Sequence, residues 1–378
     1  MTQIYNVGID AHAIGLKQGG NETYVCGLLK GLSQVEYPDF RYIVFLSEDI
    51  PEPDFLSGRK NFSIIRISPR ASLRFLIDIP VKTYTERLDL LHTQYHLPFI
   101  SHCTGVITLH DISFLRYPEF FPRELYWRLK LSLLYSVKKT RKIITVSEFS
   151  KKEILEFYRI ADEKIEVVYN GVSENFRPVD AQNRDIILKK YGITRPYILS
   201  VSNIQPRKNL SRLVKAFLSL LKNNEKFPYD LVIVGKKLWL YNEIFNEIRN
   251  THFKERIILT DYVSEKDLVF LYNYADVFIY PSLYEGFGLP VIEAMACGCP
   301  VITSNVSSLP EVVGKAGILV DPYSVEEIAK AIYNVIKNKD LREVLKIEGI
   351  KQSRKFSWKI TAEKTLKVYE EILQYAYP

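Results

Sequence analysis

One stretch of the chain, residues 280–298 with the sequence YPSLYEGFGLPVIEAMACG, limits the possible folds more than any other. The apolar run 276–280 before it predicts a short buried strand. Gly286 and Gly288 allow a tight turn, Pro290 suits the first turn of a helix, and Gly298 suits its end. The stretch therefore predicts a strand, a glycine turn and a helix, one unit of an α/β fold.

The chemistry of this stretch indicates a ligand that carries both phosphates and hydroxyls. A helix N-terminus after a glycine turn favours an anionic group such as a diphosphate. Glu285 in the turn would repel phosphates but could accept hydrogen bonds from hydroxyls, and Glu293 could hold a diol. The pattern favours a nucleoside diphosphate sugar, with an ordinary strand-turn-helix bearing surface acids as the alternative.

Within this strand, glycine turn and helix, the two glutamates, separated by seven residues, resemble the signature of retaining glycosyltransferases of family four, which have the GT-B fold. The resemblance covers essentially the whole chain and is tightest over residues 200–322. It implies that Glu285 holds hexose hydroxyls and that Glu293 holds the ribose. It also places the donor against the backbone at four positions, namely Phe287, Gly288, Leu289 and Pro290.

A basic pair follows the first predicted strand of the second half. Arg207 and Lys208, in Pro-Arg-Lys-Asn, stand where a strand ends and a helix starts, so they could neutralise a diphosphate. Solvent-facing charges are the alternative. The motif also resembles the family's basic motif, and by that resemblance Tyr262 and Val263 lie in the loop that holds the nucleotide base.

In the first half of the chain, the candidate site residues are glycines and histidines. Gly19 and Gly20 lie in a loop between a strand and a helix, and by resemblance they face the donor phosphate, although an ordinary tight turn is the alternative. His110 ends a predicted strand, where ligands gather in parallel sheets, and by resemblance it lies beside the hexose. His92, also expected at a strand end, and His96 are weaker candidates for the acceptor side.

Residues 116–142 hold eight basic and two acidic side chains among many aromatic and leucine residues. Such a helix could lie on an anionic membrane, which would suit a lipid-linked acceptor. It could equally be an ordinary helix with its apolar face in the core, and we favour that interpretation.

The resemblance implies two Rossmann-like domains whose parallel sheets face each other across a deep cleft. We expect an acceptor-side domain over residues 1–178 and a nucleotide-sugar domain over 179–355. We expect the helix of residues 356–378 to cross back to the first domain. Within the first of these domains, a helix is predicted over Arg70–Thr85.

Composition narrows the class of protein. Four cysteines without metal-ligand spacing, no apolar run of 18 residues and no signal-like N-terminus predict a cytoplasmic protein with reduced thiols. It could lie at the inner face of the membrane. The net charge of +7 suits an anionic nucleotide but is too small to indicate nucleic acid. We expect no metal and no cofactor.

The expected function is metal-independent transfer of a hexose, with retention, to a glycan or lipid-linked glycan in surface polysaccharide synthesis. The expected catalytic residues are His110, Arg207, Lys208 and Glu285. UDP-glucose is slightly preferred as the donor because UDP sugars are common in the family, and GDP-mannose is the alternative. A nucleotide-sugar epimerase and a non-catalytic sensor remain as other classes.

Overall fold

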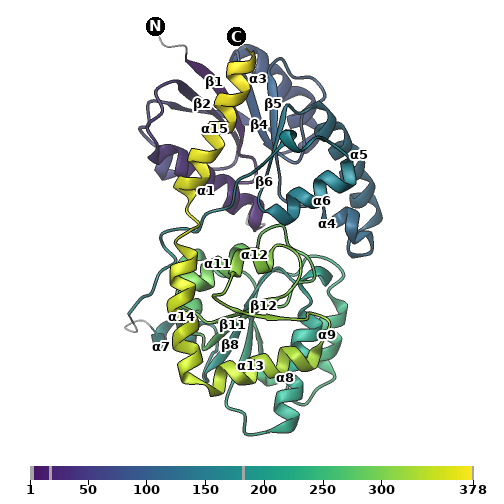
Figure 1. Ribbon diagram of the computed structural model, residues 1–378, viewed down its shortest axis with the longest axis vertical. Coiled ribbons are helices and arrows are strands. Elements are labelled where there is room, and N and C mark those ends of the chain that lie inside the picture. The colour runs from purple at the N-terminus through teal and green to yellow at the C-terminus, as the bar shows by residue number, and fades with distance from the viewer. Residues whose placement is uncertain (1–3, 17–18, 181–183, 377–378) are drawn as a thin grey trace. The chain divides into compact units, whose positions relative to one another are not determined.

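The computed structural model describes residues 4–16, 19–180 and 184–376. The chain divides into two compact units, each built on a parallel sheet with helices on its faces (Figure 1). Unit 1 comprises residues 1–116, 122–171 and 357–378, and unit 2 comprises 117–121 and 172–356. Two Rossmann-like units of this kind are the predicted fold class.

Unit 1 contains a sheet of seven strands in the order β3-β2-β1-β4-β5-β6-β7. Its strands are β1 (Tyr5–Asp10), β2 (Phe40–Ser47), β3 (Phe62–Ile67), β4 (Leu90–Gln94), β5 (Thr104–Leu109), β6 (Lys142–Thr145) and β7 (Ile165–Val167). Its helices are α1 (Gly20–Gln34), α2 (Ala71–Leu73), α3 (Ile79–Thr85), α4 (Ser113–Arg116), α5 (Arg123–Lys139), α6 (Glu148–Tyr158) and α15 (Trp358–Ala376). All these strands pair in parallel, which gathers their carboxyl ends at one edge.

Unit 2 contains a sheet of six strands in the order β10-β9-β8-β11-β12-β13. They are β8 (Tyr197–Val201), β9 (Asp230–Val234), β10 (Ile257–Leu259), β11 (Val277–Tyr280), β12 (Val301–Ser304) and β13 (Ile318–Val320). The helices are α7 (Arg184–Lys190), α8 (Leu210–Asn223), α9 (Asn242–Arg249), α10 (Glu265–Tyr274), α11 (Leu289–Ala296), α12 (Leu309–Val313), α13 (Val325–Lys337) and α14 (Lys339–Ser353).

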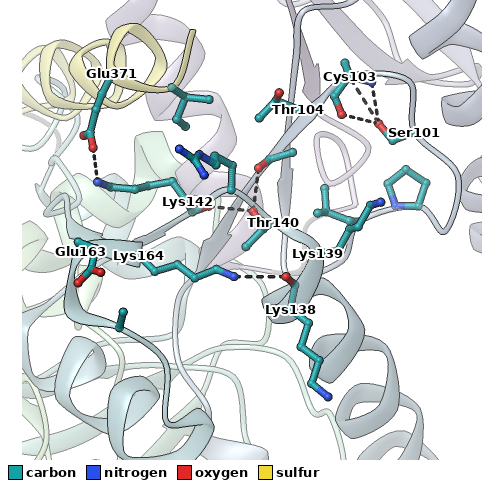
Figure 2. A pocket seen from close by; sticks show the side chains of 16 residues that line it. Ser101, Cys103, Thr104, Lys138, Lys139, Thr140, Lys142, Glu163, Lys164 and Glu371 are labelled. Carbon is teal, nitrogen blue, oxygen red and sulfur yellow. Dashed lines mark hydrogen bonds and ion pairs between the residues drawn. The ribbon is translucent and has the colours of Figure 1, made fainter. Parts of the chain in front are cut away.

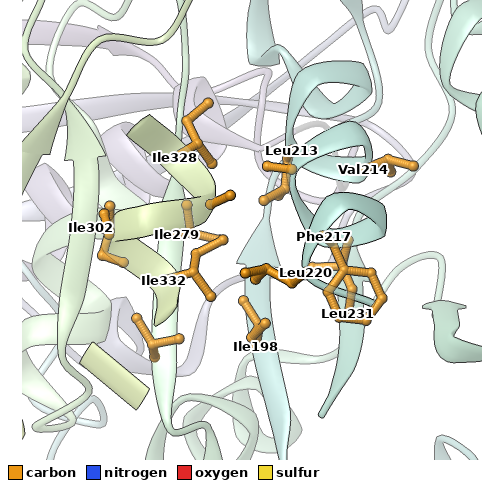
Figure 3. Close-up of a cluster of buried hydrophobic side chains, with 14 of the residues drawn as sticks. Ile198, Leu213, Val214, Phe217, Leu220, Leu231, Ile279, Ile302, Ile328 and Ile332 are labelled. Atoms are coloured by element: carbon orange, nitrogen blue, oxygen red, sulfur yellow. The ribbon is translucent and has the colours of Figure 1, made fainter. Parts of the chain in front are cut away.

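The core of unit 2 shows why this sequence forms a layered fold. Side chains of the central strands, such as Ile279, meet apolar stripes from α8 and α13 (Figure 3). Phe217 of α8 and Ile332 of α13 are completely buried in this cluster. Strands buried on both faces need nearly continuous apolar runs, as the sequence of β8, β9 and β11 provides.

The division of the chain differs from the expected domain limits. The main boundary between the units falls after Gly171 rather than after residue 178. Helix α15 belongs to unit 1, where it packs on α1, as expected for the helix of residues 356–378. A Cβ on Gly171 would lie 2.1 Å from the backbone nitrogen of Trp358, so a glycine is needed where α15 starts. Residues 117–121 belong to unit 2, which the sequence did not indicate.

The predicted helix Arg70–Thr85 is interrupted. Helix α2 is followed by a π-helical turn over Arg74–Asp78 before α3 starts at Ile79. Pro80 explains the widened turn, because it has no N–H to donate to the carbonyl of Leu76. The expected end of a strand at His92 is also wrong, since β4 continues to Gln94.

Candidate functional site

The predicted basic pair and the turn glutamate of unit 2 form one buried cluster. Lys208 lies in the 3-10 turn η6 (Pro206–Lys208), after β8. Its Nζ donates to Glu285 Oε1 at 2.5 Å and to the Tyr280 hydroxyl at 2.6 Å. Arg207 Nη1 donates to Glu285 Oε2 at 3.0 Å and to the carbonyl of Tyr284 at 2.7 Å. A single carboxylate therefore pairs with two cations at the carboxyl edge of the sheet.

The ionisation of Glu285 follows from these neighbours. Burial by itself would raise the pKa of this carboxyl, but Arg207 and Lys208 outweigh it and lower the pKa to about 2. Hydrogen bonds from the hydroxyls of Ser282 and Tyr280 to Oε1 stabilise the charged form further. Glu285 is thus a carboxylate whose oxygens are occupied by cations and hydroxyls.

The turn that carries Glu285 is held by small polar side chains that sequence reasoning missed. The Ser308 hydroxyl donates to the carbonyls of Glu285 and Phe287, and Ser307 Oγ accepts from the Glu285 amide at 3.1 Å. Asn209, with a left-handed φ of 57°, donates to the carbonyl of Pro281. Serines and asparagines beside a glycine turn are the signal that could have pointed to this network.

Helix α11 begins directly after the turn. Its N-cap is Gly288 with φ 105°, a value that favours glycine, and the predicted helical positions Leu289 and Pro290 are its first two residues. Phe287 is buried and packs edge-on against Phe356, with ring centroids 5.5 Å apart. The backbone amides of Gly288 and Leu289 lie at the positive end of the helix.

Glu293 lies one turn further along α11 and is chemically different from Glu285. Its Oε2 accepts a hydrogen bond from the Tyr272 hydroxyl at 3.0 Å. Burial raises the pKa of Glu293 to about 7, and the Tyr272 bond offsets only part of that shift. Glu293 does not belong to the cluster of Glu285 with the two cations.

The predicted base-binding residues follow β10. The ring of Tyr262 is 46% exposed and lies under Lys236 Nζ, 5.2 Å from the ring centroid, whereas Val263 is buried. The carbonyl of Asp261 accepts from the Gly235 amide at 3.0 Å, which ties the loops after β9 and β10 together. Tyr117, missed in the sequence, packs edge-on against Tyr284, with centroids 5.7 Å apart.

His110 lies at the carboxyl end of β5 in unit 1, as predicted. Its Nε2 is 2.8 Å from Gln94 Oε1, and Gln94 Nε2 donates to the carbonyl of Asn21. This orientation of the amide makes Nε2–H the donor and leaves the imidazole lone pair on Nδ1. Burial lowers the pKa of His110 to about 4, so the ring is neutral at pH 7.

The remaining candidates in unit 1 are two histidines and the two glycines at the start of α1. His92 is buried, with Nδ1 on the Tyr369 hydroxyl and Nε2 on Thr108, which makes it a packing residue. Burial lowers the pKa of His96 to about 4. Gly19, with φ 98°, is the N-cap of α1, and Gly20 is its first residue.

Two findings concern metal and thiol chemistry. Across residues 4–16, 19–180 and 184–376, His, Cys, Asp and Glu form no group of three or more that could hold a metal ion. All four cysteines are free thiols, and Cys297 and Cys299 are buried.

Comparison with known proteins identifies the family. Residues 18–176 match the profile described as Glycosyltransferase Family 4, and residues 183–352 match that of Glycosyl transferases group 1. The O-antigen chain mannosyltransferase B of Escherichia coli is 35% identical over 267 residues, covering 70% of each chain. The chain belongs to the family 4 glycosyltransferases. It is therefore a hexosyltransferase of the polysaccharide-biosynthesis branch.

Two further matches extend this assignment. The serotype-specific mannosyltransferase WbdA of Escherichia coli is 31% identical over 270 residues, which are 70% of this chain but only 32% of that longer protein. The structure of sucrose-phosphate synthase from Thermosynechococcus elongatus superimposes with a TM-score of 0.79 at 20% identity, over 98% of this glycosyltransferase and 99% of that chain. This likeness shows the GT-B fold alone.

Proposed function

We propose that this glycosyltransferase moves a mannosyl residue from GDP-mannose to a hydroxyl of a growing surface glycan, with retention at the anomeric carbon. The two relatives at 31% and 35% identity are both mannosyltransferases, and one acts on an O-antigen chain by its name. The names of these two relatives do not mention UDP-glucose, the expected donor, so that sugar serves as the competing donor in the test. A nucleotide-sugar epimerase is not supported by the family assignment.

The observation that carries the proposal is the sharing of one carboxylate by Arg207 and Lys208. A donor diphosphate offers these cations the same kind of partner, with more negative charge than Glu285 supplies. When the diphosphate takes the cations, the Glu285 carboxylate becomes available to accept hydrogen bonds from hexose hydroxyls. Donor binding thus exchanges an internal ion pair for two contacts to the substrate.

The same cations would stabilise the leaving group. As the bond between C1 of the hexose and the phosphate oxygen breaks, negative charge grows on the diphosphate. When the diphosphate replaces Glu285, Arg207 keeps its bond to the carbonyl of Tyr284 and Lys208 keeps its bond to the Tyr280 hydroxyl, so little reorganisation is needed. We propose that this charge stabilisation makes a divalent metal unnecessary.

The proton balance follows from a front-face substitution. The acceptor oxygen forms its bond to C1 on the face from which the phosphate leaves, and the departing phosphate oxygen takes the acceptor proton. This step needs no enzymic nucleophile. The neutral imidazole of His110 would orient a hexose hydroxyl through its Nδ1 lone pair, and Glu293 would accept from the ribose diol.

Calorimetric titration with GDP-mannose and UDP-glucose, in EDTA, tests the proposal. We expect micromolar binding of GDP-mannose, weaker binding of UDP-glucose, and about a hundredfold loss of GDP-mannose affinity in Lys208→Ala. Lys330→Ala, an exposed lysine of α13, is the matched control and should bind like the wild type. Equal binding by Lys208→Ala and wild type would contradict the proposed diphosphate site.

A further inference from the structure

Unit 2 contains a pocket beside the charged cluster around Glu285. Its volume is about 350 Å³, which lies within the range of small-molecule sites. Pro206 and Asn209, which flank the basic pair in sequence, line the pocket together with Leu283. The amide of Leu283 donates to the carbonyl of Arg207 at 2.9 Å. The pocket and the charged cluster therefore share a wall within one unit.

Aromatic side chains form much of the pocket. Tyr117 and Phe120 are stacked, with ring centroids 5.2 Å apart and an angle of 5° between their planes. Tyr241 and Tyr323 also line the pocket, and they are 37% and 53% exposed. A tyrosine offers both an apolar face and a hydroxyl. These rings therefore suit a ligand that has apolar surface as well as polar groups.

The segment 117–121 forms one wall of the pocket and is fixed on unit 2 by its own contacts. Trp239 Nε1 donates to the carbonyl of Phe120 at 2.7 Å, and the rings of Phe121 and Trp239 lie 5.9 Å apart. Tyr117 packs edge-on against Tyr284, the residue before Glu285. Because these contacts hold the wall, a ligand does not have to order it on binding.

The charges of the pocket are nearly balanced. The charged side chains in its lining are Arg212, Glu119 and Glu243. The guanidinium of Arg212 lies over the Tyr323 ring, 5.2 Å from its centroid, and Lys215 Nζ lies 3.8 Å from Glu243 Oε1. An anion would find no excess of positive charge here, and Glu119 would repel it. The pocket therefore favours a ligand without net charge.

A larger pocket in unit 1 shows what a lining for an anion looks like. Five cations and two carboxylates line it, and Glu371 accepts from Lys142 at 2.7 Å (Figure 2). Such an excess of positive charge attracts anions. The difference in charge between the two pockets separates the kinds of ligand that they can hold.

The polar groups of the unit 2 pocket disfavour a wholly apolar ligand. Ser211 Oγ donates to Glu243 Oε1 at 2.7 Å, and Gln205 and Glu119 also belong to the lining. Hydrocarbon over these groups would remove their water without giving them new hydrogen bonds. Hydroxyls can donate to carboxylates and accept from amide and guanidinium groups. A neutral ring that has an apolar face and several hydroxyls, such as a sugar, fits both the aromatic and the polar parts of the pocket.

We propose that this pocket is a second glycan subsite, which binds a mannose unit of the acceptor chain other than the one that receives the new sugar. The inference rests on the proposed function, because the chain that it binds is the growing glycan. An aromatic ring would pack on the C–H face of this mannose, while Glu119, Gln205 and Arg212 would bond its hydroxyls. The wall shared with the charged cluster keeps the subsite near the donor.

Calorimetric titration of the full chain with mannotetraoses of different linkages, without donor, tests the subsite. We expect at least one of them to bind the wild type, with about a tenfold loss of affinity in Tyr323→Ala. Tyr333→Ala, which alters a tyrosine of α13 that is 44% exposed, is the matched control and should bind like the wild type. Both tyrosines are exposed, so both variants should fold.

Transfer assays with GDP-mannose provide a second readout. Tyr323→Ala should raise the KM for the mannotetraose acceptor by about tenfold and leave kcat nearly unchanged. The KM for methyl mannoside, which is too short to occupy both places, should stay the same. A merely structural role of Tyr323 would change both KM values alike.

Three results would each overturn the subsite. They are the absence of binding by every mannotetraose, equal binding by Tyr323→Ala and the wild type, and an equal loss of GDP-mannose affinity in Tyr323→Ala. The last result would make the pocket part of the donor site. The proposed function fails in a different way, through GDP-mannose binding that is absent or that persists in Lys208→Ala.

Discussion

The candidate residues of unit 2 are charged, whereas the candidate histidines of unit 1 are neutral. In unit 2, Arg207, Lys208 and Glu285 are all ionised and hold one another. In unit 1, His110 is a neutral ring that a glutamine orients, and His92 is a neutral ring between two hydroxyls. Both sets of residues lie on or beside parallel sheets, and the histidines occupy β4 and the end of β5. The same kind of fold therefore carries charged side chains in one unit and neutral ones in the other.

The difference suits the two tasks that we propose. Developing negative charge on a diphosphate is best stabilised by cations fixed beforehand. A hexose is neutral, so a neutral group such as the His110 ring can also orient one of its hydroxyls without a counter-ion. In unit 1, burial lowers the pKa values of the histidines. In unit 2, burial would raise the pKa of Glu285, but its ion pairs lower it.

The largest effect should follow from breaking the charged cluster. Glu285→Gln leaves two buried cations without their carboxylate, so the free energy of unfolding of unit 2 should fall by about 4 kcal/mol. Urea titration monitored by hydrogen exchange of peptides from β11 and β12 would measure it. Glu293→Gln is the matched control, because a carboxyl with a pKa of about 7 and a single hydroxyl partner should lose little as an amide. Similar losses in both variants would contradict the difference between the glutamates.

The next largest effect should be a difference between the two units in how acid changes their stability. The pKa values of His92 and His110 are lowered to about 3 and about 4, so between pH 6.5 and 4 the unfolded chain binds more protons than the folded one. The stability of unit 1 should therefore fall by about 2 kcal/mol for each of these histidines between pH 7 and pH 5.

Glu293 should act in the opposite direction in unit 2. Its pKa is raised to about 7, so the folded state binds more protons between pH 4.5 and 7, and this contribution favours unit 2 at the acidic end. Hydrogen exchange of β5 and β12 peptides at pH 7 and pH 5, corrected for intrinsic rates, would compare the units. A larger acid-induced loss in β12 than in β5 would contradict the assignment.

A smaller effect should follow when a negative charge is placed beside the neutral ring of His110. Gln94→Glu places a carboxylate 2.8 Å from the position of His110 Nε2, and its charge should raise the His110 pKa by about one unit, or about 1.4 kcal/mol. Histidine NMR titration would measure this, since the chain has only six histidines. Gln352→Glu, a glutamine of unit 2, is the control and should leave the His110 pKa unchanged. No change in Gln94→Glu would remove Gln94 as the partner that orients the ring.

Much of the fold was predictable because its signals are local. The strand, glycine turn and helix around Glu285 follow from Gly286, Gly288 and Pro290, whose backbone preferences act over a few residues. Strands buried on both faces appear in the sequence as apolar runs, so the strands before Glu285, Arg207 and His110 were predicted. The prediction failed where a local run was ambiguous, as at His92, because an apolar run does not show where a buried strand ends.

The pairing of the site residues was not predictable in the same way. Lys208 and Glu285 meet across 77 positions of sequence, and no local pattern shows that one carboxylate would hold both cations. Gln94 gives no signal at all, because its role depends on the return of β5 beside β4. The orientation of the helical segment around Arg74 gives no local signal either, since Arg74 and Ile79 are buried while Leu76 and Ile77 are exposed.

The helix of residues 123–139 shows most clearly what could not be predicted from the sequence. Its sequence fits both a core helix and a surface helix, and the structure has features of both, since Leu133 and Val137 are buried whereas Trp127 and Leu131 are 55% and 64% exposed. Contact of this helix with a membrane stays a prediction. In the part of the chain that the structure describes, no helix is long and apolar enough to cross a membrane.

Metal-free mannosyl transfer that depends on Arg207 and Lys208 can be measured in one assay. The enzyme is incubated with GDP-mannose, EDTA and lipid-linked glycans extracted from membranes, and the products are identified by mass spectrometry. We predict that glycans gain one hexose in EDTA, that UDP-glucose gives less product, and that Lys208→Ala gives almost none while Lys330→Ala matches the wild type. Transfer that appears only after a divalent cation is added, or that persists in Lys208→Ala, would contradict the account.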